Sequence, residues 1–399
     1  MHPVGPTLSG LAATKSLSPD AVSGETDIFL MKVDSWCEIS GLTCLGFGFT
    51  ADLSRPFGWF AGKRLRLFFV SFCDSLWPNF RSMSLDLAAI RAAHERIRPF
   101  IKRTPVLTSD ALDATHGARL SFKCENLQAA GAFKSRGACN AVFSLTDAEA
   151  ANGVVTHSSG NHAAALARAA RLRGITAHIV MPTGAPQSKV QNVVSFGGRI
   201  TFCEPGLSAR EAACAQIAAA TGAAIIPPFD DYRVMAGQGT ATIELLEDAP
   251  DLDFILCPVG GGGLLSGTAV AAKNLKSGLK VIGVEPALAD DVAQSFRAGR
   301  RISIPTPATI ADGLRTNCTG EKNFPIIQRY VDDIVTVSEE AIVTAMRELW
   351  EKLHIVIEPS AAVPYAAFLE NKFPFTGKNV GLILTGGNVD LDSMPWLKK

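Results

Sequence analysis

Between residues 150 and 290 the chain alternates short apolar runs with stretches of helical pattern. The runs lie at Val154, Ala177 to Met181, Arg199 to Phe202, Ala223 to Ile226, Phe254 to Val259 and Val281 to Val284. Strands that alternate with helices pair in parallel, because each helix carries the chain back along the sheet before the next strand begins. The sequence therefore predicts an α/β fold with mostly parallel sheets covered by helices.

Composition narrows the class of protein further. A chain of 399 residues with 47% hydrophobic content can bury a large core, and its length suggests two domains. The formal net charge is zero and no basic block is present, so nucleic acid is not an expected partner. Nine cysteines at irregular spacing, without a Cys-x-x-Cys motif, are typical of reduced thiols in a cytoplasmic protein.

Lys134, directly after Phe133 in the segment GAFKSRGA, is the first candidate for covalent chemistry. A lysine that attacks a carbonyl must be neutral, and burial beside apolar groups disfavours its charged form. Phe133 also offers a surface for a flat ring. An isolated Phe-Lys pair is more often a surface lysine beside a core phenylalanine. The interpretation of Lys134 therefore depends on the motifs around it.

Four consecutive glycines, residues 260 to 263, separate the strand-like run 253–259 from a predicted helix over Leu264 to Lys276. Glycines at such a junction let backbone N–H groups approach a phosphate, and the helix N-terminus favours the anion. One or two glycines would suffice for a tight turn. No Gly-Lys-Ser/Thr follows, and the spacing is not Gly-x-Gly-x-x-Gly. The predicted ligand is a small phosphate ester.

The segment SSGNH, residues 158–162, closes another apolar run and opens an Ala-rich helix over Ala163 to Arg173. Ser and Asn at this position are ordinary N-cap residues. Beside a buried lysine and a phosphate loop, Asn161 can bind a phenolic oxygen while a serine faces the substrate. His157 and His162 complete no metal-ligand set and are read as structural. Together the three motifs indicate an aldehyde cofactor that carries a phosphate, which is pyridoxal phosphate.

From about residue 85 to 397 the chain resembles the fold type II pyridoxal phosphate enzymes. Within them it is similar to the serine/threonine dehydratase and serine racemase group, which includes hydroxyaspartate dehydratases. The resemblance implies a large domain (83–150 and 227–399), a small mobile domain (151–226) with the cofactor between them, and a homodimer. It rests on seven motifs in order: ENLQ leading to FK (125–134), SSGNH (158–162), MAGQGT (235–240), GGGG (260–263), ADGL (311–314), IEPS (357–360) and LTGGNVD (384–390).

The resemblance also implies roles for the cofactor-binding residues. Lys134 resembles the lysine that forms the Schiff base and acts as the base on one face, and Phe133 is the neighbour of the ring. Asn161 would bind the ring oxygen and Thr385 the pyridine nitrogen. A hydroxyl cannot keep the pyridine protonated as a carboxylate would, so the ring is a weaker electron sink and favours loss of a β-substituent. The phosphate would be held by Gly260, Gly261, Gly262, Gly263 and Leu264.

Ser159 decides between two activities in this group. Many threonine dehydratases have alanine at the matching position, whereas serine racemases resemble this chain in having serine, which acts on the face opposite the lysine. Bases on both faces permit racemisation, and one base alone permits elimination. The resemblance assigns the substrate carboxylate to Ser158, Ser159, Gly160, Asn161 and His162.

Arg210 matches an arginine associated with substrate binding in serine racemase. An arginine there could hold a second carboxylate, which would suit 3-hydroxyaspartate. A surface ion pair near a helix start explains Arg210 equally well. The segment PPFDD at 227–231 is more similar to the dehydratase pattern than to the mammalian racemase pattern.

Glu285 and Asp291 lie six residues apart after a strand-like run. Alone, such residues are more often part of a solvated acidic loop. Serine racemases and hydroxyaspartate dehydratases bind a divalent cation through matching Glu, backbone carbonyl and Asp positions. The resemblance therefore implies a Mg²⁺ or Mn²⁺ site made by Glu285, the Ala289 carbonyl and Asp291, with water as further ligands.

Residues 1–82 differ from the rest. Residues 1 to 56 have no sustained period, and the aromatic-rich stretch Phe57 to Phe80 is interrupted by the charges of KRLR at 63–66. This is not the pattern of a membrane span or of a signal peptide. We expect Met83 to be the native start, with residues 1–82 a disordered extension or a misassigned start. The end at Lys399 leaves no room for a C-terminal regulatory domain, so feedback control by isoleucine is not expected.

The preferred function is that of an ammonia-lyase, a dehydratase that converts L-serine, L-threonine or 3-hydroxyaspartate to a 2-oxo acid and ammonia. Amino-acid racemisation through Ser159 is the alternative, with dehydration as a side activity. A β-replacement synthase is less favoured because its Thr-Ser-Gly-Asn-Thr loop is absent. A non-catalytic binding protein is disfavoured because Lys134 is intact.

Overall fold

The computed structural model describes residues 35–39, 42–46 and 84–397 of the chain. The chain divides into two units, residues 1–79 and residues 80–399, and each is described by itself. In the first, β1 (Ser35–Ile39) pairs antiparallel with β2 (Leu42–Gly46). Most of the predicted N-terminal extension, including the proposed start at residue 83, lies outside the described residues.

A six-stranded sheet forms the larger part of the second unit. Its strands stand in the order β11-β10-β9-β12-β4-β3, and every neighbouring pair is parallel except β3 with β4. These strands are β3 (Val106–Leu107), β4 (Arg119–Cys124), β9 (Phe254–Pro258), β10 (Lys280–Pro286), β11 (Asp333–Val337) and β12 (Asn379–Leu384).

A four-stranded sheet, wholly parallel, has the order β7-β6-β5-β8. Its strands all fall between β4 and β9 in the sequence: β5 (Val154–His157), β6 (Ala177–Pro182), β7 (Arg199–Cys203) and β8 (Ala224–Ile225). Each apolar run predicted to be a strand is one, which confirms the α/β fold of parallel sheets. The predicted domain boundaries at 151 and 226 stay a prediction.

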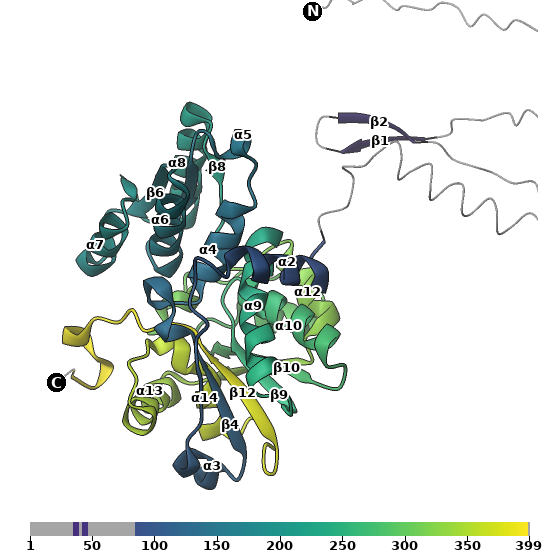
Figure 1. Cartoon of the computed structure of the whole chain (residues 1–399), viewed down its shortest axis with the longest axis vertical. Coiled ribbons are helices and arrows are strands. Elements are labelled where there is room, and N and C mark those ends of the chain that lie inside the picture. The colour runs from purple at the N-terminus through teal and green to yellow at the C-terminus, as the bar shows by residue number, and fades with distance from the viewer. Residues whose placement is uncertain (1–34, 40–41, 47–83, 398–399) are drawn as a thin grey trace, which may run out of the picture. The chain divides into compact units, whose positions relative to one another are not determined.

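Helices cover both sheets (Figure 1), and the teal helices α6, α7 and α8 surround the four-stranded sheet at the upper left. The helix predicted from Ala163 begins two residues earlier, at Asn161. The helices are α2 (Leu87–Ile97), α3 (Asp110–His116), α4 (Lys134–Phe143), α5 (Asp147–Ala150), α6 (Asn161–Arg173), α7 (Gln187–Ser195), α8 (Leu207–Thr221), α9 (Tyr232–Asp248), α10 (Gly263–Leu275), α11 (Asp291–Ala298), α12 (Asn323–Tyr330), α13 (Glu339–Leu353) and α14 (Pro359–Leu369). Short 3-10 turns are η1 (Glu125–Leu127), η2 (Ala129–Gly131), η3 (Asp312–Leu314), η4 (Leu391–Ser393) and η5 (Pro395–Leu397).

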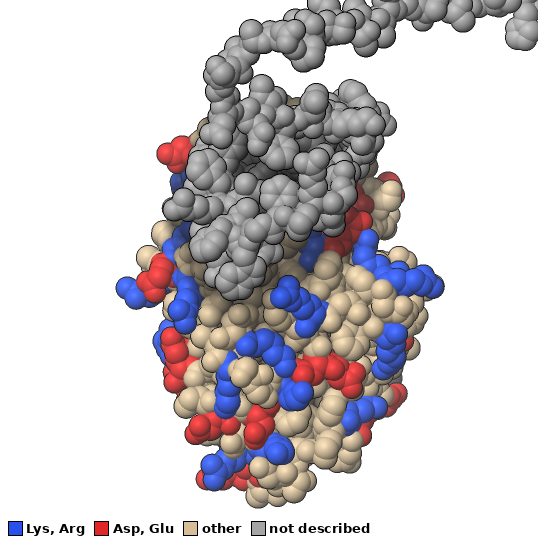
Figure 2. Space-filling view, turned by 90° about the vertical axis from the view of Figure 1, so that its right-hand side faces the viewer, with Lys and Arg blue, Asp and Glu red and all other residues tan. Residues whose placement is uncertain are grey.

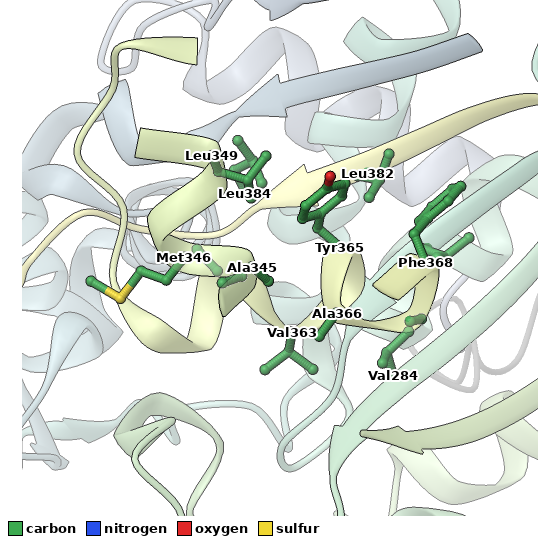
Figure 3. Packing of buried hydrophobic residues seen from close by; sticks show 14 of the residues in the cluster. Val284, Ala345, Met346, Leu349, Val363, Tyr365, Ala366, Phe368, Leu382 and Leu384 are labelled. Atoms are coloured by element: carbon green, nitrogen blue, oxygen red, sulfur yellow. The ribbon is translucent and has the colours of Figure 1, made fainter. Parts of the chain in front are cut away.

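The largest hydrophobic cluster packs α13 and α14 against the six-stranded sheet. Figure 3 shows side chains of both helices meeting those of the strands, with Tyr365 and Phe368 of α14 beside Leu382 of β12. A second cluster surrounds the four-stranded sheet and includes α4 residues such as Ala138 and Val142. Helix α4 therefore packs into the core of the smaller sheet, although its first residue lies beside the larger one.

The described surface carries mixed charge. On the face shown in Figure 2, lysines and arginines lie among aspartates and glutamates over the part that is not grey. Within residues 84–397 and the two short strands before them, no helix is long and apolar enough to cross a membrane.

Candidate active site

Lys134 is the first residue of α4, and two separate segments determine its place. The Phe133 N–H donates to the Thr385 carbonyl at 3.0 Å, which ties the start of the helix to the end of β12. The Lys134 ammonium donates to the Pro228 carbonyl at 2.7 Å and lies 5.1 Å from the centre of the Phe133 ring. The lysine and its phenylalanine neighbour thus stand where the connections after β8 and β12 meet.

The environment of Lys134 favours its neutral form. Burial lowers the pKa of Lys134 from 10.5 to about 8, while the nearby carboxyl group of Glu358 opposes the shift. The N-terminus of a helix is also an unfavourable place for a positive charge. With a pKa near ~8, about a tenth of the lysine is a neutral amine at pH 7, compared with less than a thousandth for an ordinary lysine.

A buried ionic network holds the first turn of α4. The Arg136 guanidinium is completely buried and donates two hydrogen bonds of 2.7 Å to Glu125 and two of 2.7 and 2.8 Å to Glu244. Lys123 adds a further bond of 2.7 Å to Glu244. Two cations and two anions thus join α4 to β4, η1 and α9, two residues from Lys134.

The SSGNH segment forms the turn between β5 and α6. The Gly160 N–H donates to the Ser158 hydroxyl at 3.3 Å, so Ser158 stabilises the turn, and Ser159 is half-buried. The Asn161 amide nitrogen donates to Glu358 at 2.8 Å, and its oxygen accepts a bond of 2.9 Å from Asn388. Asn161 therefore reaches across to residues beyond β12 and α13.

His162 is 2% exposed, and its Nε2 donates to the Ile226 carbonyl at 3.2 Å. Burial, reinforced by the charge of Lys134, lowers the pKa of His162 from 6.5 to about 3. The ring is therefore neutral near pH 7 and enclosed. This environment suits the structural interpretation of His162 better than contact with a substrate.

The four glycines form the turn from β9 into α10. Gly262 has a φ of +96°, which side chains disfavour, and a Cβ on Gly261 would lie 2.4 Å from atoms of the Phe229 ring. No side chain caps α10, whose first turn also contains the buried Leu264. Its first N–H groups therefore lack helical partners and suit an anion.

Thr385 follows β12 and is 3% exposed. Its Oγ1 is buried and has no hydrogen-bond partner among the described residues. An unpaired buried hydroxyl is unfavourable in an isolated protein, and a bound group with a ring nitrogen would satisfy it. The backbone of Thr385 is held beside that of Phe133, the neighbour of Lys134, because the Thr385 carbonyl accepts from the Phe133 N–H.

Glu358 is a buried carboxyl group to which the sequence analysis assigned no role. It stands directly before α14 and is 4% exposed. Burial first, and repulsion from Asp312 second, raise the pKa of Glu358 from 4.5 to about 8, although Lys189 and Asn161 oppose the shift. The IEPS motif contains this residue, but an acid before a proline at a helix start also reads as an ordinary N-terminal residue. Only its burial distinguishes Glu358 from an ordinary acidic residue at a helix N-terminus.

The predicted cation-binding residues lie between the end of β10 and the start of α11. Glu285, Ala289 and Asp291 are completely buried. The Glu285 carboxylate accepts backbone N–H groups of Val292 at 3.3 Å and Ala293 at 2.7 Å. One Asp291 oxygen accepts from the Thr316 hydroxyl at 3.4 Å, and the other has no partner among the described residues.

Burial raises the pKa of Asp291 to about 7 and, together with repulsion from Asp291, raises the pKa of Glu285 well above its usual value. Two buried carboxyl groups that repel each other favour a cation between them. In the described part of the chain no group of three or more His, Cys, Asp and Glu side chains is placed to hold a metal, so any site here uses the two carboxylates and backbone or water oxygens.

Arg210 lies apart from this arrangement. Its Nε donates to the Gly206 carbonyl of its own helix start at 3.2 Å. Its charge contributes to the lowered pKa of His157, whose main cause is burial. Among the described contacts, Arg210 has no hydrogen bond to Lys134, Ser159 or Asn161. The structure therefore brings Arg210 toward the end of β5 without joining it to the lysine.

The described residues fit pyridoxal phosphate in three respects. They provide a lysine with a lowered pKa, an uncapped helix start at the last of four glycines, and a buried hydroxyl without a partner. Segment 228–229 connects the first two, because Pro228 accepts from Lys134 and Phe229 packs on Gly261. A fold of parallel sheets with this site defines the class of fold type II enzymes.

Comparison with known proteins gives the same class. The model of the pyridoxal-phosphate dependent enzyme family matches residues 97–386, and the chain belongs to that family. It is 49% identical over 321 residues to a serine racemase of Arabidopsis thaliana, covering 79% of this chain and 97% of the relative. It is 52% identical over 305 residues to a beta-hydroxyaspartate dehydratase of Paracoccus denitrificans, covering 76% of this chain and 96% of the relative. The structure of maize serine racemase matches with a TM-score of 0.76 at 46% identity, over 77% of this chain and 95% of that one.

These findings confirm the resemblance to the dehydratase and racemase group. Similar proteins of the family include both lyases and racemases, so both activities that the sequence analysis kept open are supported.

Proposed function

We propose that the protein is a pyridoxal phosphate-dependent ammonia-lyase that acts on a β-hydroxy amino acid. The observation that carries the proposal is the buried, unpartnered hydroxyl of Thr385 beside the turn of Lys134. When bound, the cofactor withdraws electrons from the substrate Cα, and a hydroxyl partner leaves it a weaker electron sink than a carboxylate would. Elimination of a β-hydroxyl needs less electron withdrawal than reactions with a long-lived carbanion.

Each residue of the site would have a distinct task. Lys134 would hold the cofactor covalently and then move the Cα proton, for which its lowered pKa is suitable. The backbone of Gly260 to Leu264 would hold the phosphate. Phe133 would face the ring, Asn161 its oxygen and Thr385 its nitrogen. Ser158 to Asn161 would receive the substrate carboxylate at the start of α6, and His162 would keep its structural position behind them.

Racemisation is the second candidate activity, and Ser159 is the residue that favours it. Its hydroxyl lies in the turn after β5, on a different segment from Lys134. A second proton-transfer group opposite the lysine would return the proton to the other face. The similar proteins of Arabidopsis thaliana and maize are named serine racemases.

The substrate and cation parts of the proposal rest on particular residues. L-serine, L-threonine and 3-hydroxyaspartate are the candidate substrates, and the hydroxyaspartate dehydratase of Paracoccus denitrificans supports the third. Arg210 would meet a second carboxylate there. Glu285, Asp291 and the Ala289 carbonyl would hold Mg²⁺ or Mn²⁺, which would relieve the repulsion between two buried carboxylates. A cytoplasmic homodimer is also part of the proposal.

One experiment tests the function. The purified protein would be reconstituted with pyridoxal phosphate, and absorbance of the Schiff base, oxo-acid release and change of chirality would be measured for the three substrates, with and without a chelator. We expect a coloured wild type that releases ammonia, and a Lys134→Ala variant without the Schiff-base band. Lys378→Ala removes an exposed lysine and should behave as wild type.

A colourless, inactive wild type would refute the proposed function. An unchanged activity and stability after chelation would refute only the cation site, because no hydrogen bond in the described part of the chain joins Lys134 or Thr385 to Glu285 or Asp291.

A further inference from the structure

Glu358 and Asn161 meet across 197 positions of sequence, and their hydrogen bond has a defined direction. The Asn161 Nδ2 donates to Glu358 Oε1 at 2.8 Å. The Asn161 Oδ1 accepts from Asn388 Nδ2 at 2.9 Å, and the same Asn388 nitrogen donates to the Ala130 carbonyl at 2.8 Å. Because a carbonyl can only accept, Ala130 determines which end of the Asn388 amide faces Asn161.

This chain of bonds leaves Asn161 only one orientation. If its amide were reversed, its NH₂ group would face the donating NH₂ group of Asn388. In the orientation present, the oxygen of Asn161 is used and one of its two N–H groups is given to Glu358. One N–H group remains. Asn161 can therefore offer the cofactor's ring oxygen this N–H group as a donor.

Glu358 is buried and closely packed against the turn after β12. A Cβ on Gly386 would lie 2.5 Å from Glu358 Oε1. The charged groups that face Glu358 are Asp312, which raises its pKa, and Lys189 and Lys134, which favour the anion. Burial outweighs the two lysines, and the pKa of Glu358 rises to about 8. At pH 7 the group is mainly a neutral acid, with one oxygen that accepts and one O–H that donates.

We propose that Glu358 is a positioning residue that works in its protonated form and orients the Asn161 amide so that its remaining N–H faces the cofactor's ring oxygen. This inference rests on the proposed function. Its consequence is a dependence on pH. When Glu358 loses its proton, a negative charge would be held next to Asn161, and Asn161 is the residue that would bind the cofactor's ring oxygen. A negative charge there would favour the protonated form of the ring oxygen and would change the absorbance of the bound cofactor.

Two substitutions separate the protonated form from the anion. A glutamine has the same shape as a protonated glutamate and the same pair of one accepting oxygen and one donating group. Glu358→Gln should therefore keep the wild-type spectrum of low pH, keep the dissociation constant of pyridoxal phosphate within about twofold, and lose the spectral transition. Glu358→Ala leaves Asn161 without a partner and should weaken pyridoxal phosphate binding about tenfold.

The measurements are absorbance spectra of the reconstituted enzymes from about pH 6.5 to about pH 9.5 and pyridoxal phosphate titrations by fluorescence. Glu351→Gln, in an exposed pair on α13, is the matched control and should titrate as wild type does. A Glu358→Gln variant with the alkaline transition of the wild type would overturn the inference. The same conclusion follows if this variant resembles the wild type at alkaline pH throughout, because the anion would then not be the perturbing form.

If Glu358→Ala does not fold, the comparison of Glu358→Gln with the wild type still decides the matter. Failure of the proposed function would be distinct, because the wild type itself would then bind no pyridoxal phosphate and release no product.

Discussion

Single side chains in this site owe their chemistry to burial. Burial lowers the pKa of Lys134 to about 8 and raises the pKa of Glu358 to about 8. These pKa shifts cannot be predicted from the motifs alone, because an exposed lysine or glutamate in the same motif would have an ordinary pKa. The consequences of burial can be measured at individual residues.

His162 should make stability depend on pH below neutrality. Its folded-state pKa of about 3 lies below the unfolded value of 6.5, so the unfolded chain binds the proton first. The stability that neutral His162 maintains is complete above pH 6.5 and is lost as pH falls toward 3. At pH 5 the loss should approach ~2 kcal/mol. Urea unfolding at about pH 7 and about pH 5 measures this loss. The free energy of unfolding of His162→Gln should depend less on pH than that of the wild type, whereas the exposed substitution His354→Asn should leave the pH dependence unchanged.

Ser159 should separate the two proposed activities. Ser159→Ala removes the proton-transfer group opposite Lys134, so racemisation should fall by about 10² or more while elimination from L-substrates continues. The rates of chirality change and of oxo-acid release measure the two activities in one sample. Equal loss on L- and D-substrates would contradict the assignment of Ser159 to a separate face.

Elements position these side chains through close backbone packing and buried charge. The turn from β9 to α10 approaches Phe229 too closely for any side chain at Gly261, and α4 is held by the ions around Arg136. A local defect in either element should therefore affect both stability and the site.

Gly261→Ala should overpack the phosphate turn. Its Cβ would lie 2.4 Å from atoms of the Phe229 ring, and relief of that clash should cost about 1–3 kcal/mol. The displaced turn should also bind pyridoxal phosphate more weakly. Gly278→Ala is the control, because it is exposed and has no atom within 4 Å of the new Cβ. Urea unfolding and cofactor titration of both variants measure the difference, and equal values would refute the packing argument.

Helix α9 contains a buried and an exposed acid that can be compared directly. Glu244 is buried and forms ion pairs with Arg136 and Lys123. Glu247 pairs with Arg103 at the surface, where both side chains are about half exposed. Glu244→Gln leaves buried cations uncompensated and should lower the free energy of unfolding by about 3–5 kcal/mol. Glu247→Gln should change it by less than about 1 kcal/mol. Similar losses in both variants would show that burial does not determine the effect.

At the level of the whole molecule, residues from both sheets build one site. Lys134 and Thr385 lie beside the six-stranded sheet, and Asn161 follows a strand of the four-stranded sheet. The Lys189 ammonium on α7 pairs with Asp312 of η3 and so forms a second link between the two parts, near Glu358. Movement of one sheet against the other would open or close access to this region.

The Lys189–Asp312 pair should restrain α7. Both side chains are partly exposed, at 27% and 36%, so the contribution of the pair is small. Asp312→Asn should speed hydrogen exchange of α7 amides by roughly two- to fivefold and raise KM. Glu321→Gln removes a comparable surface pair with Arg301 and should leave α7 unchanged. Unchanged exchange in Asp312→Asn would mean that the pair does not hold the two parts together.

Local patterns were sufficient to predict some of these features. The strands from β5 to β10 follow from apolar runs, and the turn at Gly260 to Gly263 follows from glycine itself. Strands β4, β11 and β12 were not predicted, although the run NVGLIL of β12 is as apolar as the others. The role of Thr385 came from a resemblance, and only its burial explains why its hydroxyl needs a partner.

The sequence by itself determined the kinds of elements and the residues able to carry the chemistry, because periodicity, glycine conformation and side-chain type act over a few neighbouring residues. The tertiary structure decided which of them meet and in which protonation state. Asn161 and Glu358 are 197 positions apart, and Lys134 and Pro228 are 94 apart. Hydrogen bonds, desolvation and charge interactions act through space, so they exist only after distant segments have packed together.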